Sequence, residues 1–516
     1  MAHSSGDTSS TAPDGRRAQH DKSDVAELAK QLVSGRKLLV ATNRGPLYFT
    51  EDRSSELTAK RDNSRVSESF DPLSDVPVTW ISGAVSSADR KAMETLSSDG
   101  GSILSDAIPA AWQVRFVAPP RRVHHKFYNV ICNPLLWFLL HRSWSPTFTP
   151  TIGAQEHDAW NRGYRAVNQM FADEVSVAAD NDSFALISRD YQLMLVPGMV
   201  RKSHPDAAIH HSFETPWPWP SDFEIFPPEW REQVLESLLM ADFISFPSSR
   251  DIRAFIACTT VFMGMDGRVE TLTGNSISFA GRNVRLVVSP PSTRSVQFKS
   301  VADFDATKRI ISDLNSEDFG HTFVTVDRAE PHKNIVRSIN GFGELLRREP
   351  EIVSHARYLL FLNPGPAHIS AYKRLSDEIR RAARRVNEKA GDYLPVRVVE
   401  ESNFYRAVAA LCIYDTLVSV PVIDGSGRAA FDGPMVNEVN GSIILSETNV
   451  AADHFGDYVS RVGFADTSGL ADAMGAAIAE SEDDRKRKAD GIRSILDAAP
   501  EAEFLRQMLS DLLTVG

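Results

Sequence analysis

Short apolar runs alternate with amphipathic stretches along the first half of the chain. The apolar runs predict buried strands, and they stand at 37–44, 78–82, 114–118, 184–188, 207–213 and 243–246. Segments with helical spacing lie between several of them, as at 229–242, where Trp230, Val234 and Leu238 recur on one face. Alternating short strands and helices are typical of parallel βαβ units in an open sheet.

The second half repeats this order after a stiff break at Pro290-Pro291. Strands are predicted at 321–328, 358–364, 396–400, 416–422 and 442–448, and helices at 334–349, 370–390, 468–480 and 500–514. We therefore predict an α/β fold of two Rossmann-like, doubly wound domains that face each other across a cleft. The domains span 25–290 and 291–480, and helices within 481–516 pack back across both.

The first 24 residues precede a predicted helix at about 24–35 and contain no apolar segment. Their Ser, Thr, Gly and Asp content predicts a disordered tail over 1–24 rather than a secretory signal. No apolar run in the sequence reaches the length of a membrane helix. Cys132, Cys258 and Cys412 lie far apart and outside metal-ligand spacing, which indicates reduced thiols and a cytoplasmic protein.

The length and the net charge of the chain limit the number of domains and the classes of partner that can be expected. A chain of 516 residues suits two domains of about 200 to 250 residues each. The 56 Lys and Arg residues face 68 Asp and Glu residues, a formal net charge of −12. This balance argues against partners such as nucleic acid or a membrane surface, which favour a positive excess. One basic pocket in an acidic protein can still bind an anionic ligand.

Polar side chains follow many of the predicted strands. Ligands of open parallel sheets bind outside the carboxyl ends of strands, often with a phosphate at a following helix. The residues at such ends are Asn43-Arg44, Arg189-Asp190, Glu214, Asp327-Arg328, Asn363 and Asp424. The candidate chemistry is therefore expected along these two sheet edges.

The segment VDRAEPHKN at 326–334 carries the sharpest signal. Arg328 and Lys333 are two cations beside a helix start, a combination that suits a diphosphate and the charge of a departing nucleotide. In the alternative interpretation, which is equally weighted, Arg328 pairs with Asp327 or Glu330 and Lys333 is solvated.

A second motif, VIDGSGRAAFDGPMVNE at 422–438, contains a glycine turn before a helix start. Amides of Gly425, Ser426 and Gly427 could meet sugar hydroxyls, and Asp424 and Asp432 could accept hydrogen bonds from a sugar and a ribose. An ordinary turn with Asp caps is the commoner explanation of such a short motif. Asp190 could likewise be a catalytic group or a helix cap. Tyr128 and Trp137 could stack on a sugar ring or pack in the core.

The ordered set of motifs resembles the trehalose-6-phosphate synthase family from about residue 37 to 480. Within that family it is most similar to the pseudoglycosyltransferases that make validoxylamine A 7′-phosphate, through LNP at 362–364 and MVNE followed by ILSET. The motifs that carry the resemblance are ATNRG, YNVICNPLLW, RDYQLMLVPGMVR, the TPWP–EIFPPEWRE stretch, DRAEPHKN, DG–FD and ILSETNVAADHFGD.

The resemblance implies a GT-B fold and a metal-independent glycosyltransferase without a cofactor, which joins two rings through their 1-positions with retention. It implies that 25–290 binds the acceptor and 291–480 the nucleotide sugar. Asp190, Arg328 and Lys333 would be catalytic. The donor would be held by Glu214, Arg328, Lys333, Asp424, Gly425, Ser426, Gly427 and Asp432. The acceptor would be held by Arg44, Tyr128, Trp137 and Asp190. No residue is assigned to a metal.

Several positions depart from the family pattern. Glu214 replaces a histidine, and the glycine-rich loop after the first strand is missing between Pro46 and Val78. Ser426 and Gly427 alter the DGMN run, Asp432 replaces a glutamate, and Pro366 stands where an arginine would hold the acceptor phosphate. The Glu214 carboxylate could pair with an ammonium group of an amino sugar or aminocyclitol; a glutamate satisfied by neighbouring backbone is weighted equally.

We therefore predict transfer of a sugar or cyclitol from a nucleotide-diphosphate donor, GDP in preference to UDP. The acceptor is a sugar or aminocyclitol whose phosphorylation stays open, and the pathway is specialised metabolism such as aminocyclitol antibiotic biosynthesis. The alternative is a catalytically silent paralogue that binds a sugar nucleotide or a partner protein. The sequence does not decide whether the protein forms a homo-oligomer.

Overall fold

The computed structural model describes residues 14–62, 65–96, 101–144, 147, 149–264, 267–291, 293, 295–316, 319–366, 369–498 and 502–515. Its first large sheet has nine strands in the order β5-β4-β1-β6-β7-β8-β11-β10-β9. The strands are β1 Lys37–Thr42, β4 Val78–Gly83, β5 Trp112–Val117, β6 Phe184–Arg189, β7 Ala208–Ser212, β8 Phe243–Phe246, β9 Val269–Leu272, β10 Ser276–Phe279 and β11 Arg282–Val288. Pairing is parallel from β5 to β11, and β10 and β9 add an antiparallel edge.

The second sheet has six parallel strands in the order β14-β13-β12-β15-β16-β17. These are β12 His321–Arg328, β13 Ala356–Asn363, β14 Val396–Glu400, β15 Thr416–Ser419, β16 Ser442–Ser446 and β17 Ser460–Val462. The central β12 buries its first five residues, His321 to Thr325, and becomes exposed only at its carboxyl end, at Arg328. Burial of successive residues on both sides of the strand is expected for a sheet that helices cover on both faces.

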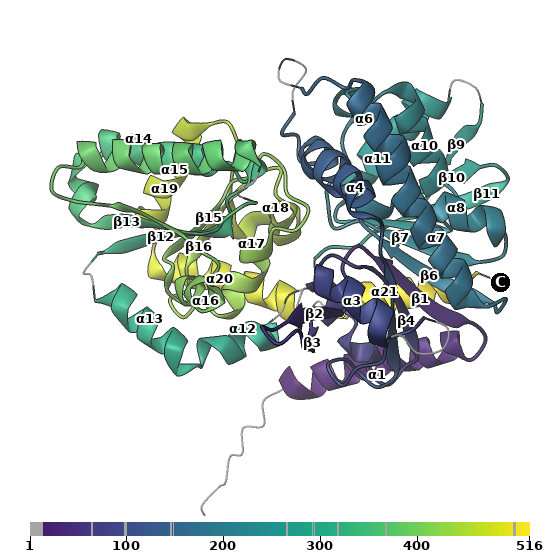
Figure 1. Cartoon of the computed structure of the whole chain (residues 1–516). Coiled ribbons are helices and arrows are strands. Elements are labelled where there is room, and N and C mark those ends of the chain that lie inside the picture. The colour runs from purple at the N-terminus through teal and green to yellow at the C-terminus, as the bar shows by residue number, and fades with distance from the viewer. Residues whose placement is uncertain are drawn as a thin grey trace, which may run out of the picture.

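Helices cover both faces of each sheet, so each sheet lies between two apolar clusters. With the first sheet lie α1 Asp14–Val33, α2 Arg65–Glu68, α3 Ser87–Leu96, α4 Arg121–His124, α5 Trp137–Leu140, α6 Ala154–Ala159, α7 Ala166–Ala179, α8 Val196–Ser203, α9 Pro220–Phe223, α10 Pro228–Leu238 and α11 Ser249–Met263. With the second lie α12 Ser295–Ala302, α13 Asp305–Asn315, α14 Ile335–Arg348, α15 Ser370–Lys389, α16 Phe404–Ile413, α17 Arg428–Asp432, α18 Val450–Phe455, α19 Thr467–Ala479 and α20 Glu482–Ala498. The two bodies stand side by side in Figure 1.

The last helix, α21 Glu503–Leu513, returns to the first sheet. Leu505, Met508 and Leu509 are buried in the same cluster as Val40 and Trp80 of β1 and β4. In Figure 1 this yellow helix lies among the purple and blue elements of the first domain. The helix before it, α20, places Ile492 and Leu496 in the core of the second domain. The chain therefore crosses back only after residue 498, later than the predicted start at 481.

Three features differ from the sequence-based expectation. Helix α1 begins at Asp14, inside the predicted tail, because the Arg, Ala, Gln and Lys residues after Gly15 are good helix formers with no proline among them; residues 1–13 lie outside the described part. A hairpin of β2 Leu47–Glu51 and β3 Leu57–Arg61 stands between Pro46 and Val78. Wide π-helical turns at His125–Leu136 and Trp160–Arg165 continue α4 and α6. Among the described residues, no helix has the length and apolar content needed to span a membrane.

Truncating Leu509 to alanine should destabilise the protein, because this side chain is fully buried between α21 and the first sheet. The expected loss is about 2 to 5 kcal/mol in the free energy of unfolding, measured by chemical denaturation. Leu104→Ala is the control, since Leu104 is 66% exposed and its loss should cost under about 0.5 kcal/mol. Equal effects of the two substitutions would contradict the docking of α21.

Candidate functional site

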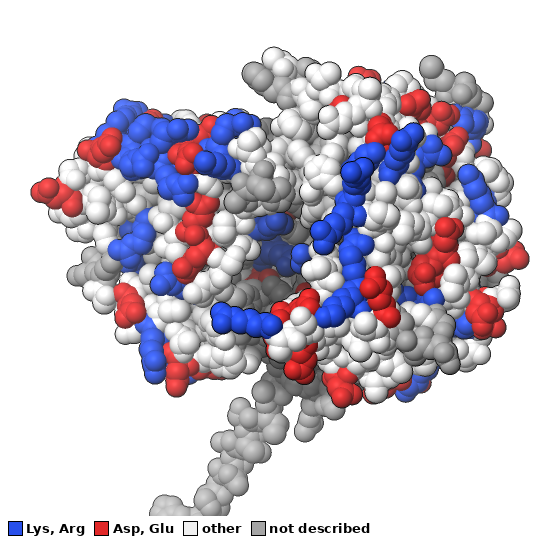
Figure 2. Space-filling model, in the orientation of Figure 1, with Lys and Arg blue, Asp and Glu red and all other residues white. Residues whose placement is uncertain are grey.

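A pocket of about 580 Å³ lies where the carboxyl ends of the two sheets face each other. It takes side chains from both sheets, and Figure 2 shows it as the hollow at the middle of the molecule. Eight residues of the predicted site line it: Trp137, Asp190, Glu214, Arg328, Lys333, Asp424, Ser426 and Asp432. The rule that ligands bind at the carboxyl edges of open sheets thus brings the separate motifs to one cavity.

Lys333 lies at the bottom of the second domain's side of this pocket. It ends a single 3₁₀ turn, Pro331–Lys333, after β12, and its ammonium is 2.8 Å from Asp327 Oδ1 and 2.7 Å from Asp424 Oδ2. Burial works against its charge, but the two carboxylates outweigh burial and raise its pKa. Burial likewise opposes the charge of Asp424, yet Lys333 and the Ser426 donors lower the pKa of Asp424 to about 2. The solvated Lys333 of the alternative interpretation is therefore wrong, since only 8% of its side chain is exposed.

Arg328 projects further into the pocket and is half exposed. Its Nη2 is 2.8 Å from Oε1 of Glu330, a carboxylate that is 1% exposed. The other oxygen of Glu330 accepts hydrogen bonds from Trp137 Nε1 at 2.8 Å and from the Tyr372 hydroxyl at 2.9 Å. Trp137 belongs to the first domain and Tyr372 to α15 of the second. Glu330 therefore orients Arg328 and joins the domains across the cleft, a role that its place between Arg328 and Lys333 in the sequence could have suggested.

Two histidines that the sequence analysis left unassigned form part of the wall. The rings of His141 and His332 lie 4.1 Å apart, one from each domain. Burial lowers the pKa of His141 to about 4 and that of His332 further, and the neighbouring Lys333 and Arg328 act in the same direction. His141 Nδ1 lies 2.8 Å from the Trp137 carbonyl oxygen. Both rings are therefore neutral at physiological pH and add no charge to the pocket.

Asp190 follows β6 in an unusual backbone conformation. Its φ of 67° and ψ of 174° fall in a region that is occupied almost only by glycine. Burial, together with the nearby Glu214 carboxylate, raises the pKa of Asp190 to about 6. Thr215 Oγ1 lies 3.4 Å from its Oδ1. Strain of this kind is kept where the surrounding structure holds it, and functional sites are the usual place. Asp190 is thus a partly buried acid in the wall of the main pocket rather than a helix cap.

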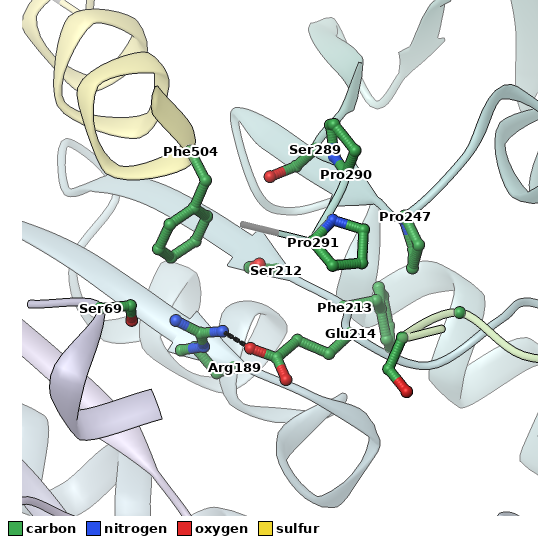
Figure 3. A pocket seen from close by; sticks show the side chains of 12 residues that line it. Ser69, Arg189, Ser212, Phe213, Glu214, Pro247, Ser289, Pro290, Pro291 and Phe504 are labelled. Atoms are coloured by element: carbon green, nitrogen blue, oxygen red, sulfur yellow. Dashed lines mark hydrogen bonds and ion pairs between the residues drawn. The ribbon is translucent and has the colours of Figure 1, made fainter. Parts of the chain in front are cut away.

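Glu214 already faces two cations. Its Oε1 is 2.5 Å from Arg189 Nη2, and its Oε2 is 3.9 Å from Nη2 of Arg428 in the second domain. The side chain of Arg189 is 4% exposed, and its guanidinium lies over the ring of Phe504 from α21, 4.9 Å from the ring centre. Figure 3 shows this pair in a small side pocket beside the main cleft, with Ser69 and Pro291 around it. Arg189 is therefore a partner of the Glu214 carboxylate, which the sequence analysis left unpaired.

The loop at 424–427 forms the wall opposite Glu214. Asp424 Oδ1 accepts hydrogen bonds from the amide of Ser426 at 2.8 Å and from its hydroxyl at 2.9 Å. A Cβ at Gly425 would lie 2.7 Å from the Glu214 carbonyl oxygen, so only glycine permits this approach of the domains. Gly427 has a φ of +49°, which also favours glycine. Neither glycine lines the main pocket: Gly425 borders the side pocket, and Gly427 shapes the turn.

The far end of the pocket is an apolar slot with a polar rim. Its walls are side chains of the second domain, namely Phe298, Val326, Phe361, Val399, Phe404 and Leu411. On the rim, Arg406 Nε lies 3.1 Å from Glu401 Oε1, and Ser402 Oγ donates to Asn363 Oδ1 at 2.5 Å. A flat aromatic ring would fit between such walls, with its edge toward the rim. Of this set, only Asn363 stood out in the sequence, because the others lie on elements with ordinary patterns.

Arg44 and Tyr128 of the predicted acceptor set do not line the main pocket. They lie near it, because the charges of both Arg44 and Arg328 act on the half-buried Tyr128 hydroxyl, whose pKa burial raises. Among the described residues, no group of three or more His, Cys, Asp or Glu side chains is placed to hold a metal ion. The arginine and lysine side chains that line the pocket are Arg328, Lys333, Arg406 and Arg428.

Comparison with known proteins places this geometry in context. A model of glycosyltransferase family 20 matches residues 36–512. Validamine 7-phosphate valienyltransferase of Streptomyces hygroscopicus subsp. jinggangensis is 26% identical over 405 residues, which cover 78% of this chain and 79% of that protein. The UDP-forming α,α-trehalose-phosphate synthase 2 of Aspergillus niger is 24% identical, over 79% of this chain and 84% of its own length.

Solved structures agree on the fold. The structure described as trehalose-6-phosphate from E. coli bound with UDP-2-fluoro glucose superposes with a TM-score of 0.78, over 93% of this chain and 99% of that one, at 18% identity. A UDP-forming α,α-trehalose-phosphate synthase from Burkholderia xenovorans in complex with glucose-6-phosphate gives 0.76, over 92% and 100%, also at 18% identity. The GT-B fold expected from the sequence is confirmed.

Replacing Asp190 by asparagine should remove a pH-dependent loss of stability. The carboxyl has a pKa of about 6 in the folded protein against an ordinary value of 3.8, so its protonated form favours folding. That advantage is complete below about pH 4 and is lost as the pH rises through about 6. The free energy of unfolding of the unmodified protein should fall by roughly 2 to 3 kcal/mol relative to the variant over this range, measured by urea denaturation. A constant difference between the two proteins would show that Asp190 titrates normally.

Proposed function

Because the chain belongs to glycosyltransferase family 20, we propose that it is a retaining, metal-independent enzyme that transfers a sugar or cyclitol from a GDP-linked donor. The single observation that carries this proposal is one continuous pocket. Its lining residues Glu401, Asn363, Arg328 and Asp424 follow the neighbouring strands β14, β13, β12 and β15, and Asp190 faces them from the first domain. This order suits the succession of nucleobase, diphosphate and transferred ring in a nucleotide sugar.

Each part of the donor meets a fitting group in this proposal. The base lies in the slot beside Phe404, the ribose hydroxyls at Asp432, the diphosphate at Arg328 and the transferred ring against the 424–427 loop. Lys333 is paired with two carboxylates and Arg328 with one, and the Arg328 side chain is half exposed, so of these two Arg328 is the cation that can turn toward the diphosphate. The role of Lys333 is then to fix Asp424 and its loop at the ring.

Transfer follows without a carboxylate nucleophile. The bond from C1 of the ring to the β-phosphate oxygen breaks, and a bond from an acceptor oxygen to the same face of C1 forms. The departing phosphate oxygen takes the acceptor's proton, and Arg328 stabilises the negative charge that develops there. The products are a nucleoside diphosphate and a 1,1-linked, non-reducing compound. Asp190 lies at the junction between donor and acceptor and holds the acceptor.

The preference for GDP has a physical basis in the rim of the base slot. A carboxylate can accept two parallel hydrogen bonds from the N1–H and N2–H₂ donors of guanine, whereas uracil offers one ring N–H. Glu401 is a half-exposed carboxylate on this rim. The relative named for validamine 7-phosphate supports a cyclitol or amino-cyclitol acceptor and a role in specialised metabolism.

A catalytically silent, ligand-binding protein is the second candidate. It is favoured by the Arg189–Glu214 ion pair, because a buried salt bridge stands where the family has a histidine that faces the donor. Turnover of any donor separates the two candidates.

A thermal-shift panel of GDP, UDP, ADP and TDP tests the donor site. A nucleotide present at 100 times its dissociation constant adds about 2.7 kcal/mol to the stability of the folded protein. The shift should disappear in Arg328→Ala and persist in Arg380→Ala, a similarly exposed arginine on α15 outside the pocket. Failure of all four nucleotides to shift the unmodified protein would contradict the donor site and favour a silent protein that binds a partner protein instead.

Glu401→Gln tests how the base is chosen. The amide keeps one acceptor oxygen but loses the charge and the second acceptor, so affinity for GDP should fall about tenfold, the equivalent of one charge-assisted hydrogen bond. Affinity for UDP, measured by calorimetry on the same protein, should change little. An unchanged ratio of the two dissociation constants would remove Glu401 from guanine recognition.

A further inference from the structure

The charge balance of the main pocket is unfavourable for a diphosphate. Of the described residues that line the pocket, seven are carboxylates and four are cations. A nucleotide sugar carries negative charge on both phosphates, so it needs cations that can turn toward it. Lys333 is held between Asp327 and Asp424, and Arg406 Nε lies 3.1 Å from Glu401 Oε1. Both of these cations are therefore already paired.

Arg428 is the least constrained of the four cations. It is the first residue of α17, it lines the pocket, and 43% of its side chain is exposed. Within the described part of the chain its ion-pair partner is Glu214, whose Oε2 lies 3.9 Å from Arg428 Nη2. This separation is too long for a hydrogen bond, and the attraction is weaker than at the 2.8 Å of the Arg328–Glu330 pair. Arg428 belongs to neither the donor set nor the acceptor set predicted from the sequence.

Arg428 can leave Glu214 at low cost. The other oxygen of this carboxylate, Oε1, is 2.5 Å from Nη2 of the buried Arg189 (Figure 3). Arg189 and Glu214 both belong to the first domain, so their pair stays closed when Arg428 moves. A partly buried carboxylate is destabilised when it loses its sole partner, but here one charge-assisted partner remains. A phosphate can therefore replace Glu214 as the partner of Arg428.

The position of Arg428 suits the diphosphate. Helix α17 follows β15, and β15 is the neighbour of β12, which ends at Arg328. Neighbouring strands lie about 4.8 Å apart, so the two arginines follow adjacent strands at the same edge of the sheet. The 424–427 loop, which the proposed function places at the transferred ring, lies directly before Arg428 in the chain. Phosphates attached to that ring are therefore expected between the two guanidinium groups.

We propose that Arg428 binds the diphosphate of the donor and leaves Glu214 to do so. It is then the second arginine, beside Arg328, for the charge that develops on the departing phosphate. Because Glu214 belongs to the first domain, the exchange also removes one attraction between the domains. The assignment to the donor rests on the proposed glycosyl transfer, whereas the cation site itself does not.

The test measures the affinity for inorganic pyrophosphate and for GDP by calorimetry at constant ionic strength. Arg428→Gln should weaken the binding of both about tenfold, since it removes one charge-assisted contact. The variant should fold, because the side chain is half exposed. Arg250→Gln is the matched control. Arg250 also joins the domains, through the Glu447 carbonyl oxygen at 2.6 Å, but it does not line the pocket, so both affinities should stay unchanged.

A double-mutant cycle tests the exchange itself. Glu214→Gln keeps a hydrogen-bond acceptor for Arg189 but removes the charge that attracts Arg428. The affinity for pyrophosphate should therefore rise roughly two- to fivefold, the equivalent of a partly exposed ion pair. The rise should be smaller when Arg428→Gln is also present. Pyrophosphate carries no ring, so contacts between Glu214 and the donor ring do not affect the result. Equal rises with and without Arg428 would overturn the exchange.

The remaining outcomes separate this proposal from the proposed function. GDP binding that Arg328→Ala weakens and Arg428→Gln leaves unchanged would overturn the proposal and keep the donor site. An equal loss in Arg250→Gln and Arg428→Gln would also overturn it, because contact between the domains would then be responsible. Pyrophosphate binding that depends on Arg428, without binding of any nucleotide of the panel, would refute the proposed function alone. No binding of pyrophosphate or of any nucleotide would overturn both.

Discussion

The buried ion cluster of Lys333 with Asp327 and Asp424 is the interaction on which the cleft depends. It ties the end of β12 to the loop after β15, two neighbouring strands of the second sheet. Three charged groups withdrawn from water are tolerated only when they pair and their remaining hydrogen bonds are made. For Asp424, Ser426 supplies the remaining hydrogen bonds through its amide and its hydroxyl. Arg328 extends from the same strand, so its direction into the cleft follows from the cluster.

A second group of contacts positions the first domain against the domain that contains this ion cluster. Glu330 accepts hydrogen bonds from Trp137 and Tyr372. Gly425 lies so close to the backbone of Glu214 that no side chain would fit at this position. The Arg189–Glu214 pair lies directly behind that contact. Glu214 is therefore matched by a buried arginine one strand away. The β2–β3 hairpin stands after the first strand, and Ser69, which follows it, borders the same side pocket.

The sequence predicted the strands that carry the site, because runs such as YLLFL at 358–362 are apolar without a break and are followed by a polar residue, as is typical of buried strands. It therefore located Asp190, Arg328 and Asp424 at the correct sheet edges. It could not pair them: whether Lys333 is solvated or buried depends on Asp424, 91 positions later. The contact of Tyr372 with Glu330 could not be predicted, because the pattern of its helix is dominated by basic residues on the solvent face. The hairpin and the short edge strands β9 and β10 were missed because they are half exposed and lack an apolar run.

The return of α21 to the first domain has a mechanical consequence. The chain passes between the domains twice, once between β11 and α12 and once between α20 and α21. Two tethers at separate points leave one easy motion, a rotation about the line that joins them, and suppress sliding and twisting. Pro290, Pro291 and Phe504 stand together beside that line. Trp137 and Glu330 belong to different domains, whereas Arg189 and Glu214 both belong to the first. Opening of the cleft would therefore separate Trp137 from Glu330 and leave the Arg189–Glu214 pair closed.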